Sequence, residues 1–297
     1  MLVIIWSSTW VAIKIGLEDC PPLLGAGIRF AAAGLVLLAF AVVRGRSLRT
    51  DVRLAGILAL MPFALAYGLV YWGEQHIPSG LAAVLFGVLP LYTAFLGAVF
   101  LPDQPLRARL VAGILVAIGG LALAFAESID SGDPELALAG AFALAAAPLG
   151  ASVGNISLKL RAGKLDAVVL NGWGMLAGGA LLLAASAIGE SWGDAAWTGE
   201  SVGSIAYLAL IGSAVPFVVL TVLLRHISAQ ATSFLAMLLP FGALVFGATL
   251  YSEAITARAL AGAALVAVGL LIAQAVPTRG GLLRGLGVRA REIRVRD

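Results

Sequence analysis

The sequence predicts an all-α integral membrane protein with ten transmembrane helices in two inverted five-helix repeats. Three observations support this fold class. First, apolar residues make up 61% of the 297 residues and charged residues only 12%, and the mean hydropathy is +1.02. A soluble domain of this length needs a far more polar surface. Second, the apolar residues fall into runs long enough to cross a bilayer. Third, the two halves of the chain match each other at a fixed offset.

Runs of roughly 17–25 apolar residues have the length that a membrane-spanning helix needs. Ten are predicted, at about 1–17, 22–43, 54–73, 79–101, 107–126, 137–158, 167–188, 202–224, 229–251 and 256–277. The links are short, so no separate soluble domain is expected, and residues 279–297 form a basic cytoplasmic tail. The first run lacks a basic leader, so it is interpreted as a span and not a cleavable signal peptide, and the native start is expected slightly upstream.

Charged residues in the links predict the orientation. If the N-terminus is cytoplasmic, the cytoplasmic segments contain every basic residue of the 19 except Lys14, Arg29 and Arg258. The opposite face is acidic, with Glu18, Asp19, Glu127, Asp130, Asp133, Glu135, Glu190, Asp194 and Glu200. The positive-inside rule therefore places both termini in the cytoplasm of a bacterial-type inner (plasma) membrane.

The chain also repeats itself. A shift of 150 residues lays 76–124 on 226–274 without a gap, and it pairs His76 with His226 and Pro90 with Pro240. Each half, 1–126 and 137–277, holds five predicted spans. Because five is odd, the two halves enter the membrane with opposite orientation. Such inverted repeats are typical of secondary transporters that work by alternating access.

Two segments carry a resemblance to a known family. They are "GLAAVLFGVLPLYTAFLGAVF" and "TSFLAMLLPFGALVFGATLYSEAIT", each with a mid-helix proline followed seven residues later by a glycine. With the ten spans, they resemble the drug/metabolite transporter (DMT) superfamily, EamA family, and most of all its YddG-type exporters of amino acids and metabolites. Glu253 matches the acidic residue that typically precedes the last helix, whereas Asp103 in the first repeat departs from that pattern. The resemblance implies a substrate cavity between the repeats.

The first span contains an unusual set of side chains. Trp6, Trp10 and Lys14 are spaced four residues apart, so a helix places them on one face. A lysine within a membrane helix costs about 2.5–3.5 kcal/mol. One interpretation is that Lys14 snorkels to the outer interface near Glu18 and Asp19. The favoured one is that this face lines the substrate path, where Lys14 attracts a carboxylate and has water, a backbone carbonyl or Asn155 as its resting partner.

Arg29 is the second cation below the surface, about two turns into the second span. It is expected to hold helix-end carbonyls, Glu18 or Asp19, although with Lys14 it also makes the outer half attractive to anions. No Asp or Glu lies in the middle of any predicted span. A proton-coupled exporter of cationic drugs, which needs a membrane carboxylate, is therefore disfavoured.

Other aromatic and polar residues lie at helical spacing within the spans and are further candidates for the substrate path. They are Tyr67, Tyr71, Phe86, Asn155, Asn171, Trp173, Phe217, Ser233 and Met237. For each, packing in the core is the alternative. Pro90 and Pro240 occupy matching mid-span positions, where each removes a backbone hydrogen bond, so they act either as hinges or as fixed kinks.

These observations predict a secondary transporter that exports amino acids, aromatic ones among them, or similar small metabolites across the inner membrane. A drug or organic-anion transporter of the same superfamily is the alternative. An intramembrane enzyme is disfavoured, because His76 and His226 lie at helix ends on opposite faces and no carboxylate pair is buried. No cofactor or metal is expected. The expected partners are a small-molecule substrate and the lipid bilayer, not nucleic acid; the oligomeric state is left open and a monomer is compatible.

Overall fold

The computed structural model describes residues 1–101, 108–125, 133–233, 235–252 and 256–274. This part of the chain is all-α and contains no strand, as predicted. The predictions on Asp103, Glu253 and the tail 279–297 fall outside the described residues. The elements of the first half are α1 (Leu2–Asp19), α2 (Pro22–Val43), α3 (Val52–Leu58), η1 (Ala59–Ala66), α4 (Tyr67–Glu74), α5 (Ser79–Phe86), α6 (Leu89–Phe100) and α7 (Ala108–Phe125).

The second half follows the same order of long and interrupted helices. Its elements are α8 (Pro134–Arg161), α9 (Ala167–Gly189), η3 (Trp192–Asp194), α10 (Gly199–Ala209), η4 (Leu210–Ala214), α11 (Val215–His226), α12 (Ala229–Ser233), α13 (Leu235–Leu250) and α14 (Ala257–Gln274).

Seven helical stretches of the described residues are long and apolar enough to cross a membrane. They are Pro22–Val43, Val52–Glu74, Ser79–Phe100, Pro134–Arg161, Ala167–Gly189, Gly199–His226 and Ala231–Leu250. The apolar stretches within α7 and α14 are shorter, and the 18 residues of α1 include three charged side chains. A multi-pass membrane protein is therefore confirmed, while the number of ten spans stays a prediction.

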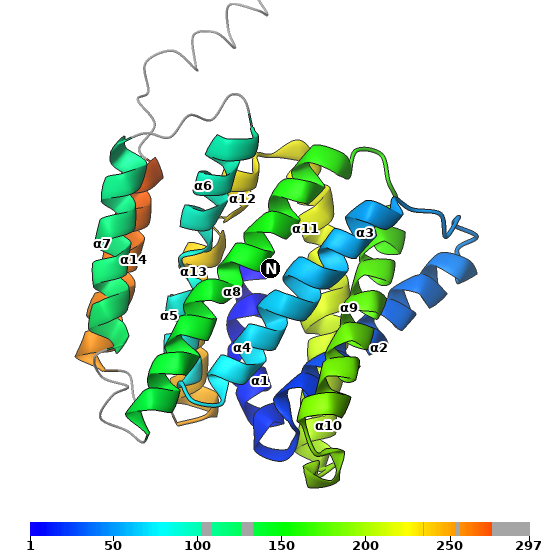
Figure 1. Ribbon diagram of the computed structural model, residues 1–297, viewed down its shortest axis with the longest axis horizontal. Helices are drawn as coiled ribbons and strands as arrows, with labels where there is room; N and C mark the ends of the chain where they lie inside the picture. The colour runs from blue at the N-terminus through cyan, green and yellow to red at the C-terminus, as the bar shows by residue number, and fades with distance from the viewer. Residues whose placement is uncertain (102–107, 126–132, 234, 253–255, 275–297) are drawn as a thin grey trace, which may run out of the picture.

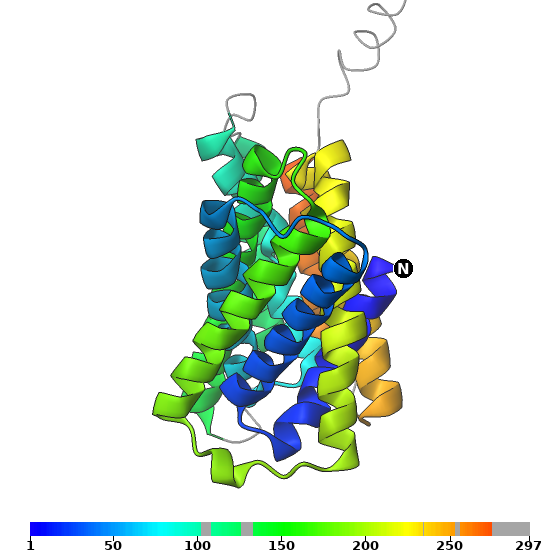
Figure 2. The same ribbon diagram turned by 90° about the vertical axis from the view of Figure 1, so that its right-hand side faces the viewer.

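The helices form one bundle, with α7 beside α14 along one edge and α2 beside α9 toward the other (Figures 1 and 2). Glycines allow both pairs to approach closely. An ideal Cβ on Gly113 of α7 would lie 2.3 Å from the Gly269 carbonyl oxygen of α14. A Cβ on Gly179 of α9 would lie 2.4 Å from the Ala31 nitrogen of α2. Side chains at these positions would push the paired helices apart, as expected for small residues at helix contacts in membranes.

Two long helices widen into a π-helical turn at matching places in the two halves. In the first half η1 contains Pro62, and in the second half Pro216 lies just after η4. Proline has no N–H to donate, so it disrupts the regular helical ladder at these points. The matched prolines lie in different local settings: Pro90 lies in the first turn of α6, after the break at Gly87 and Val88 that ends α5, whereas Pro240 lies inside α13. Their role as hinges or fixed kinks stays a prediction.

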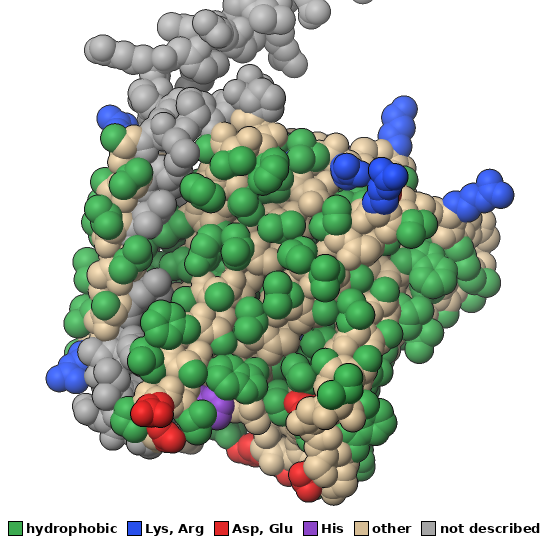
Figure 3. Space-filling model, in the orientation of Figure 1, with side chains coloured by type: hydrophobic (Ala, Val, Ile, Leu, Met, Phe, Trp, Pro, Cys, Tyr) green, Lys and Arg blue, Asp and Glu red, His purple; other side chains and the backbone are tan. Residues whose placement is uncertain are grey.

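Basic and acidic residues gather at opposite ends of the bundle. The α2–α3 link, with Arg44, Arg46 and Arg49, lies at the top of both ribbon views, and the α9–α10 link, with Glu190 and Asp194, lies at the bottom. The space-filling view shows Asp and Glu along the lower edge and an apolar surface between the two edges (Figure 3). This surface suits a bilayer, with polar groups at its two interfaces.

Candidate functional site: a central cavity

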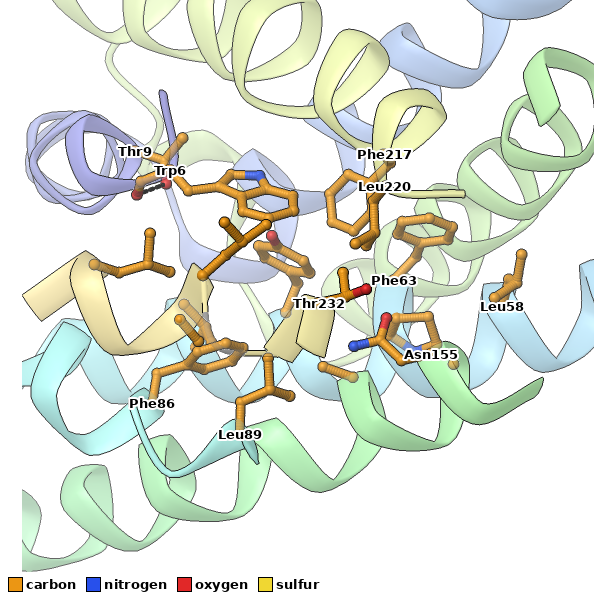
Figure 4. A pocket seen from close by; sticks show the side chains of 18 of the residues that line it. Trp6, Thr9, Leu58, Phe63, Phe86, Leu89, Asn155, Phe217, Leu220 and Thr232 are labelled. Atoms are coloured by element: carbon orange, nitrogen blue, oxygen red, sulfur yellow. Dashed lines mark hydrogen bonds between the residues drawn. The ribbon is translucent and has the colours of Figure 1, made fainter. Parts of the chain in front are cut away.

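A cavity of about 90 Å³ lies at the centre of the bundle, where the helices of both halves converge (Figure 4). The first half contributes residues of α1, α3, η1, α4, α5 and α6, and the second half residues of α8, α9, α11, α12 and α13. Ligand pockets for drug-sized molecules usually measure roughly 300–1,000 Å³. In this conformation the cavity is therefore narrow, and a substrate of amino-acid size needs it to widen.

Aromatic rings form most of one wall. Trp6 lies with its ring centroid 5.7 Å from that of Phe217, and Trp10 lies 5.5 Å from Phe86. Phe63 approaches Phe217 edge-on at 5.1 Å. These separations are those of interacting aromatic pairs, which hold one another in fixed orientations. The rings present a rigid apolar surface to the cavity (Figure 4).

The cavity is lined by equivalent positions of the two halves. Positions on α1 and α8 correspond at a shift of 145 residues. This shift pairs Trp6 with Ala151 and Trp10 with Asn155, and all four residues line the cavity. On the later helices the shift is 150 residues, which pairs Phe86 with Ala236. In each of these three pairs the first half supplies an aromatic ring and the second half a small or amide side chain. At these three matched positions the lining is bulkier on the side of the first half than on that of the second.

Few polar groups reach the cavity. Asn155, on α8, is 7% exposed, and its side-chain amide has no hydrogen-bond partner among the described residues. Thr232, on α12, donates to the Ser228 carbonyl oxygen at 3.0 Å, and Thr9 donates to the Trp6 carbonyl oxygen at 2.7 Å. The indole N–H of Trp6 is buried without a partner in the described part of the chain. The Asn155 amide and the Trp6 indole therefore keep hydrogen-bonding capacity for a substrate, and the hydroxyl of Tyr67, whose ring lies against Arg29, is a further polar group of the lining.

The structure brings together six of the residues selected from the sequence. The cavity is lined by Trp6, Trp10, Tyr67, Phe86, Asn155 and Phe217. Tyr71 and Ser233 are buried outside its lining. Trp173 is 39% exposed and its indole donates to the Leu48 carbonyl oxygen at 3.1 Å. The side chain of Met237 lies outside the described part of the structure.

Lys14 does not line the cavity. Its Nζ donates to the carbonyl oxygens of Glu74 at 2.8 Å and Ile77 at 3.4 Å, at the end of α4 and in the link that follows. A backbone carbonyl is thus its resting partner, one of the three that the sequence left open. Glu74 itself is fully buried, and it is the last residue of α4, one position beyond the predicted span 54–73. The bundle therefore buries a carboxylate at the end of a helix, although the sequence places no Asp or Glu in the middle of a predicted span.

Several lining residues were not selected from the sequence. They include Thr9, Phe63 and Thr232, whereas Asn171, at the start of the seventh predicted span, was a candidate from the sequence and also lines the cavity. Phe63 lies four residues before Tyr67, a spacing that signals a shared face, and Thr9 lies within the same stretch as Trp6 and Trp10. Asn171 already donates to the Thr221 hydroxyl and the Ala167 carbonyl oxygen. Nothing in the local sequence around Thr232 points to a cavity. In the described ranges no group of three His, Cys, Asp or Glu side chains is placed to hold a metal ion.

Comparisons with known proteins identify relatives of the whole chain. The model of the EamA-like transporter family matches residues 1–126 and 138–274. The inner membrane transporter YedA of Escherichia coli K12, described as uncharacterized, is 34% identical over 240 residues, which cover 78% of this chain and 75% of YedA. The uncharacterized transporter YoaV of Bacillus subtilis is 29% identical over 81% of this chain and 83% of its own length.

The fold is also found in a solved structure. One crystal structure superposes with a TM-score of 0.71 at 20% sequence identity, and the match covers 94% of this chain and 96% of the other. At this identity the likeness shows that the fold is shared.

Proposed function

We propose that this chain, which belongs to the EamA-like transporter family, exports amino acids and similar small metabolites across the inner membrane by alternating access. Its relatives YedA and YoaV are transporters by name. The observation that carries the proposal is the central cavity, lined by aromatic rings, by small side chains and by the unpartnered amide of Asn155. An apolar site with a few polar groups suits a small molecule that has an apolar side chain and a polar backbone.

Different lining residues would contact the apolar and the polar parts of the substrate. The rings of Trp10, Phe86 and Phe217 offer faces and edges on which an aromatic or branched side chain packs. The Asn155 side chain offers both a donor and an acceptor to polar groups. The small side chains of Ala151 and Ala236 leave space in the lining, and this favours a substrate with one bulky side chain over a compact polar one.

Contacts repeated in the two halves support the inverted arrangement that alternating access uses. The Ser7 hydroxyl of α1 donates to the Leu239 carbonyl oxygen at 3.3 Å, and the Ser152 hydroxyl of α8 donates to the Leu89 carbonyl oxygen at 3.3 Å. Both contacts cross from one half to the other. They join α1 to α13 and α8 to α6 beside the cavity, so each half holds the other in the same way.

Flux in proteoliposomes tests the proposal. Purified protein is reconstituted and loaded separately with L-phenylalanine, L-leucine, L-serine, benzoate or ethidium, and efflux is followed with and without a proton gradient. We expect phenylalanine and leucine to leave faster than serine, and faster than from protein-free liposomes. If no amino acid leaves faster than from the protein-free control, the proposed substrate class is wrong.

The alternative is transport of drugs or organic anions through the same cavity. The near absence of polar groups in its lining favours this alternative, because such a wall discriminates weakly among apolar molecules. Efflux of ethidium or benzoate without efflux of any amino acid would support it. Because the assay contains all five probes, one experiment separates the two functions.

A further inference from the structure

Arg29, on α2, is a cation enclosed in the interior of the bundle. Its side chain has no exposed surface. Its guanidinium carbon lies 4.8 Å from the ring centre of Tyr67, 5.0 Å from that of Phe30 and 5.9 Å from that of Tyr71. Aromatic faces attract a guanidinium but do not neutralise it. The expected partners from the sequence, Glu18 and Asp19, form no ion pair with it.

The hydrogen bonds of Arg29 leave one nitrogen free. Its Nε donates to the Ser213 hydroxyl at 2.8 Å, and one terminal nitrogen, Nη1, donates to the Tyr71 hydroxyl at 3.4 Å. The other, Nη2, is buried and has no partner among the described residues. Within that same part of the chain no carboxylate oxygen lies within 4 Å of the guanidinium. A buried charge in this setting strongly favours an anion that completes its coordination.

The free nitrogen lies close to the cavity. A Cβ built on Gly212 would be 3.6 Å from Nη2 of Arg29 and 2.9 Å from Cγ2 of Thr9. Thr9 lines the cavity, and so does Tyr67, on whose ring the guanidinium stacks. Arg29 thus lies directly behind Tyr67, a residue of the cavity lining, and its unsatisfied donor is on the side of Gly212, which has no side chain to cover it.

We propose that Arg29 binds the carboxylate of the transported amino acid when the cavity widens, with Thr9 and Tyr67 moving to admit it. This inference deepens the proposed function and rests on it. A guanidinium presents parallel N–H donors that match a carboxylate, which gives it an advantage over a lysine at such a site. Lys14, in contrast, already donates to two carbonyl oxygens and lies outside the cavity lining.

A matched pair of probes tests this assignment. L-phenylalanine and L-phenylalaninamide have nearly the same shape, but only the first has a carboxylate. Binding of each to purified protein is measured by isothermal titration calorimetry. Since charge-assisted hydrogen bonds are worth more than neutral ones, we expect the wild type to bind phenylalanine about 10- to 100-fold more tightly than the amide. In Arg29→Gln this ratio should fall to about one, whereas Lys14→Met should keep it.

Each result decides the matter. An undiminished ratio in Arg29→Gln, or a wild-type ratio near one, would overturn the assignment of Arg29 while leaving the proposed transport in place. A wild type that binds neither probe and exports no amino acid would overturn the proposed function, and the inference with it. Size-exclusion chromatography checks folding. If Arg29→Gln does not fold, the wild type and Arg29→Lys are compared instead. Lysine keeps the positive charge but lacks the parallel N–H donors of a guanidinium, so the phenylalanine-to-amide affinity ratio of Arg29→Lys should lie between the wild-type ratio and one.

Discussion

Lys14 and Lys159 make the same contact in the two halves of the chain. The Nζ of Lys14 donates to the carbonyl oxygens of Glu74 and Ile77, and that of Lys159 donates to those of Leu224 and Ile227, each at 2.9 Å. The acceptors differ by the 150 residues that relate the later helices, and the lysines by the 145 that relate α1 to α8. Each lysine satisfies carbonyls that a helix end leaves without an intrahelical partner.

The first prediction compares these two lysines. Because each joins one long helix to the end of another, Lys14→Met and Lys159→Met should each lower stability, by about 1.5–3 kcal/mol if one charged hydrogen bond is lost. Both should slow the flux of phenylalanine and phenylalaninamide to a similar degree. Thermal unfolding and proteoliposome efflux measure the two effects. If Lys14→Met has normal stability and loses the transport of phenylalanine but not of phenylalaninamide, Lys14 is part of the substrate path after all.

The second prediction concerns the prolines beside the cavity. Pro90 begins α6 next to the break in the chain, and Pro240 interrupts the hydrogen bonding of α13. If these are hinges, alanine at either position should slow flux by roughly 3- to 10-fold and change binding less, because a hinge affects interconversion more than the end states. Pro134→Ala, at the exposed start of α8, is the control. Normal flux in both cavity variants would leave fixed kinks as the explanation.

The third prediction uses the single cysteine of the chain. Cys20 is buried in the link between α1 and α2, and burial, with smaller contributions from Glu190 and Asp19, raises its pKa to about 11. Because the thiolate is the reactive form, alkylation at pH 8 should be about 100-fold slower than for a thiol of pKa 9. The rate should continue to rise with pH up to about 11.

A second protein provides the reference for Cys20. The variant Cys20→Ser with Gly193→Cys places a thiol in the exposed α9–α10 link. Its alkylation rate should level off near pH 9, and the native Cys20 should react at an ordinary rate once the protein is unfolded in detergent. Equal rates for the two thiols in folded protein at pH 8 would contradict the buried position of Cys20.

The fourth prediction concerns topology. The basic residues of the α2–α3 link and the acidic residues of the α9–α10 link lie at opposite ends of the bundle. By the positive-inside rule, a reporter fused after residue 297 should read cytoplasmic, and one inserted at residues 129–133 should read external. Reversed readings would refute the orientation, and readings on the same side would refute the odd number of spans in the second half.

Part of the cavity lining could be predicted from helical spacing. Trp6, Trp10, Tyr67, Phe86, Asn155 and Phe217 line the cavity, and their contact with substrate stays a prediction. Lys14 was extrapolated from the face shared with Trp6 and Trp10, but one turn beyond Trp10 its Nζ binds the Glu74 carbonyl oxygen at the end of α4 instead of lining the cavity. Spacing along a helix defines a face, and it does not say where along that face a cavity ends.

The partners of the buried cations depend on tertiary structure. Ser213 reaches Arg29 from 184 residues away, through the π-helical turn η4 that no local pattern announces. One signal was available, however. Ser7 and Lys14 are seven residues apart, as are Ser152 and Lys159, and all four side chains make matching contacts. A comparison at a shift of 145 residues would have found this pair.

The central claim is that substrate passes through the cavity between the aromatic wall and the small side chains of the second half. Counterflow of radiolabelled L-phenylalanine into preloaded proteoliposomes tests it most directly. The variant Ala236→Phe adds a ring to the cavity lining, and Val245→Phe, on the exposed face of α13, is the control. The account predicts accumulation with the wild type and with Val245→Phe, and loss of about 10-fold or more with Ala236→Phe, because an added ring has no room in a packed site. Wild-type accumulation that Ala236→Phe leaves unchanged would contradict it.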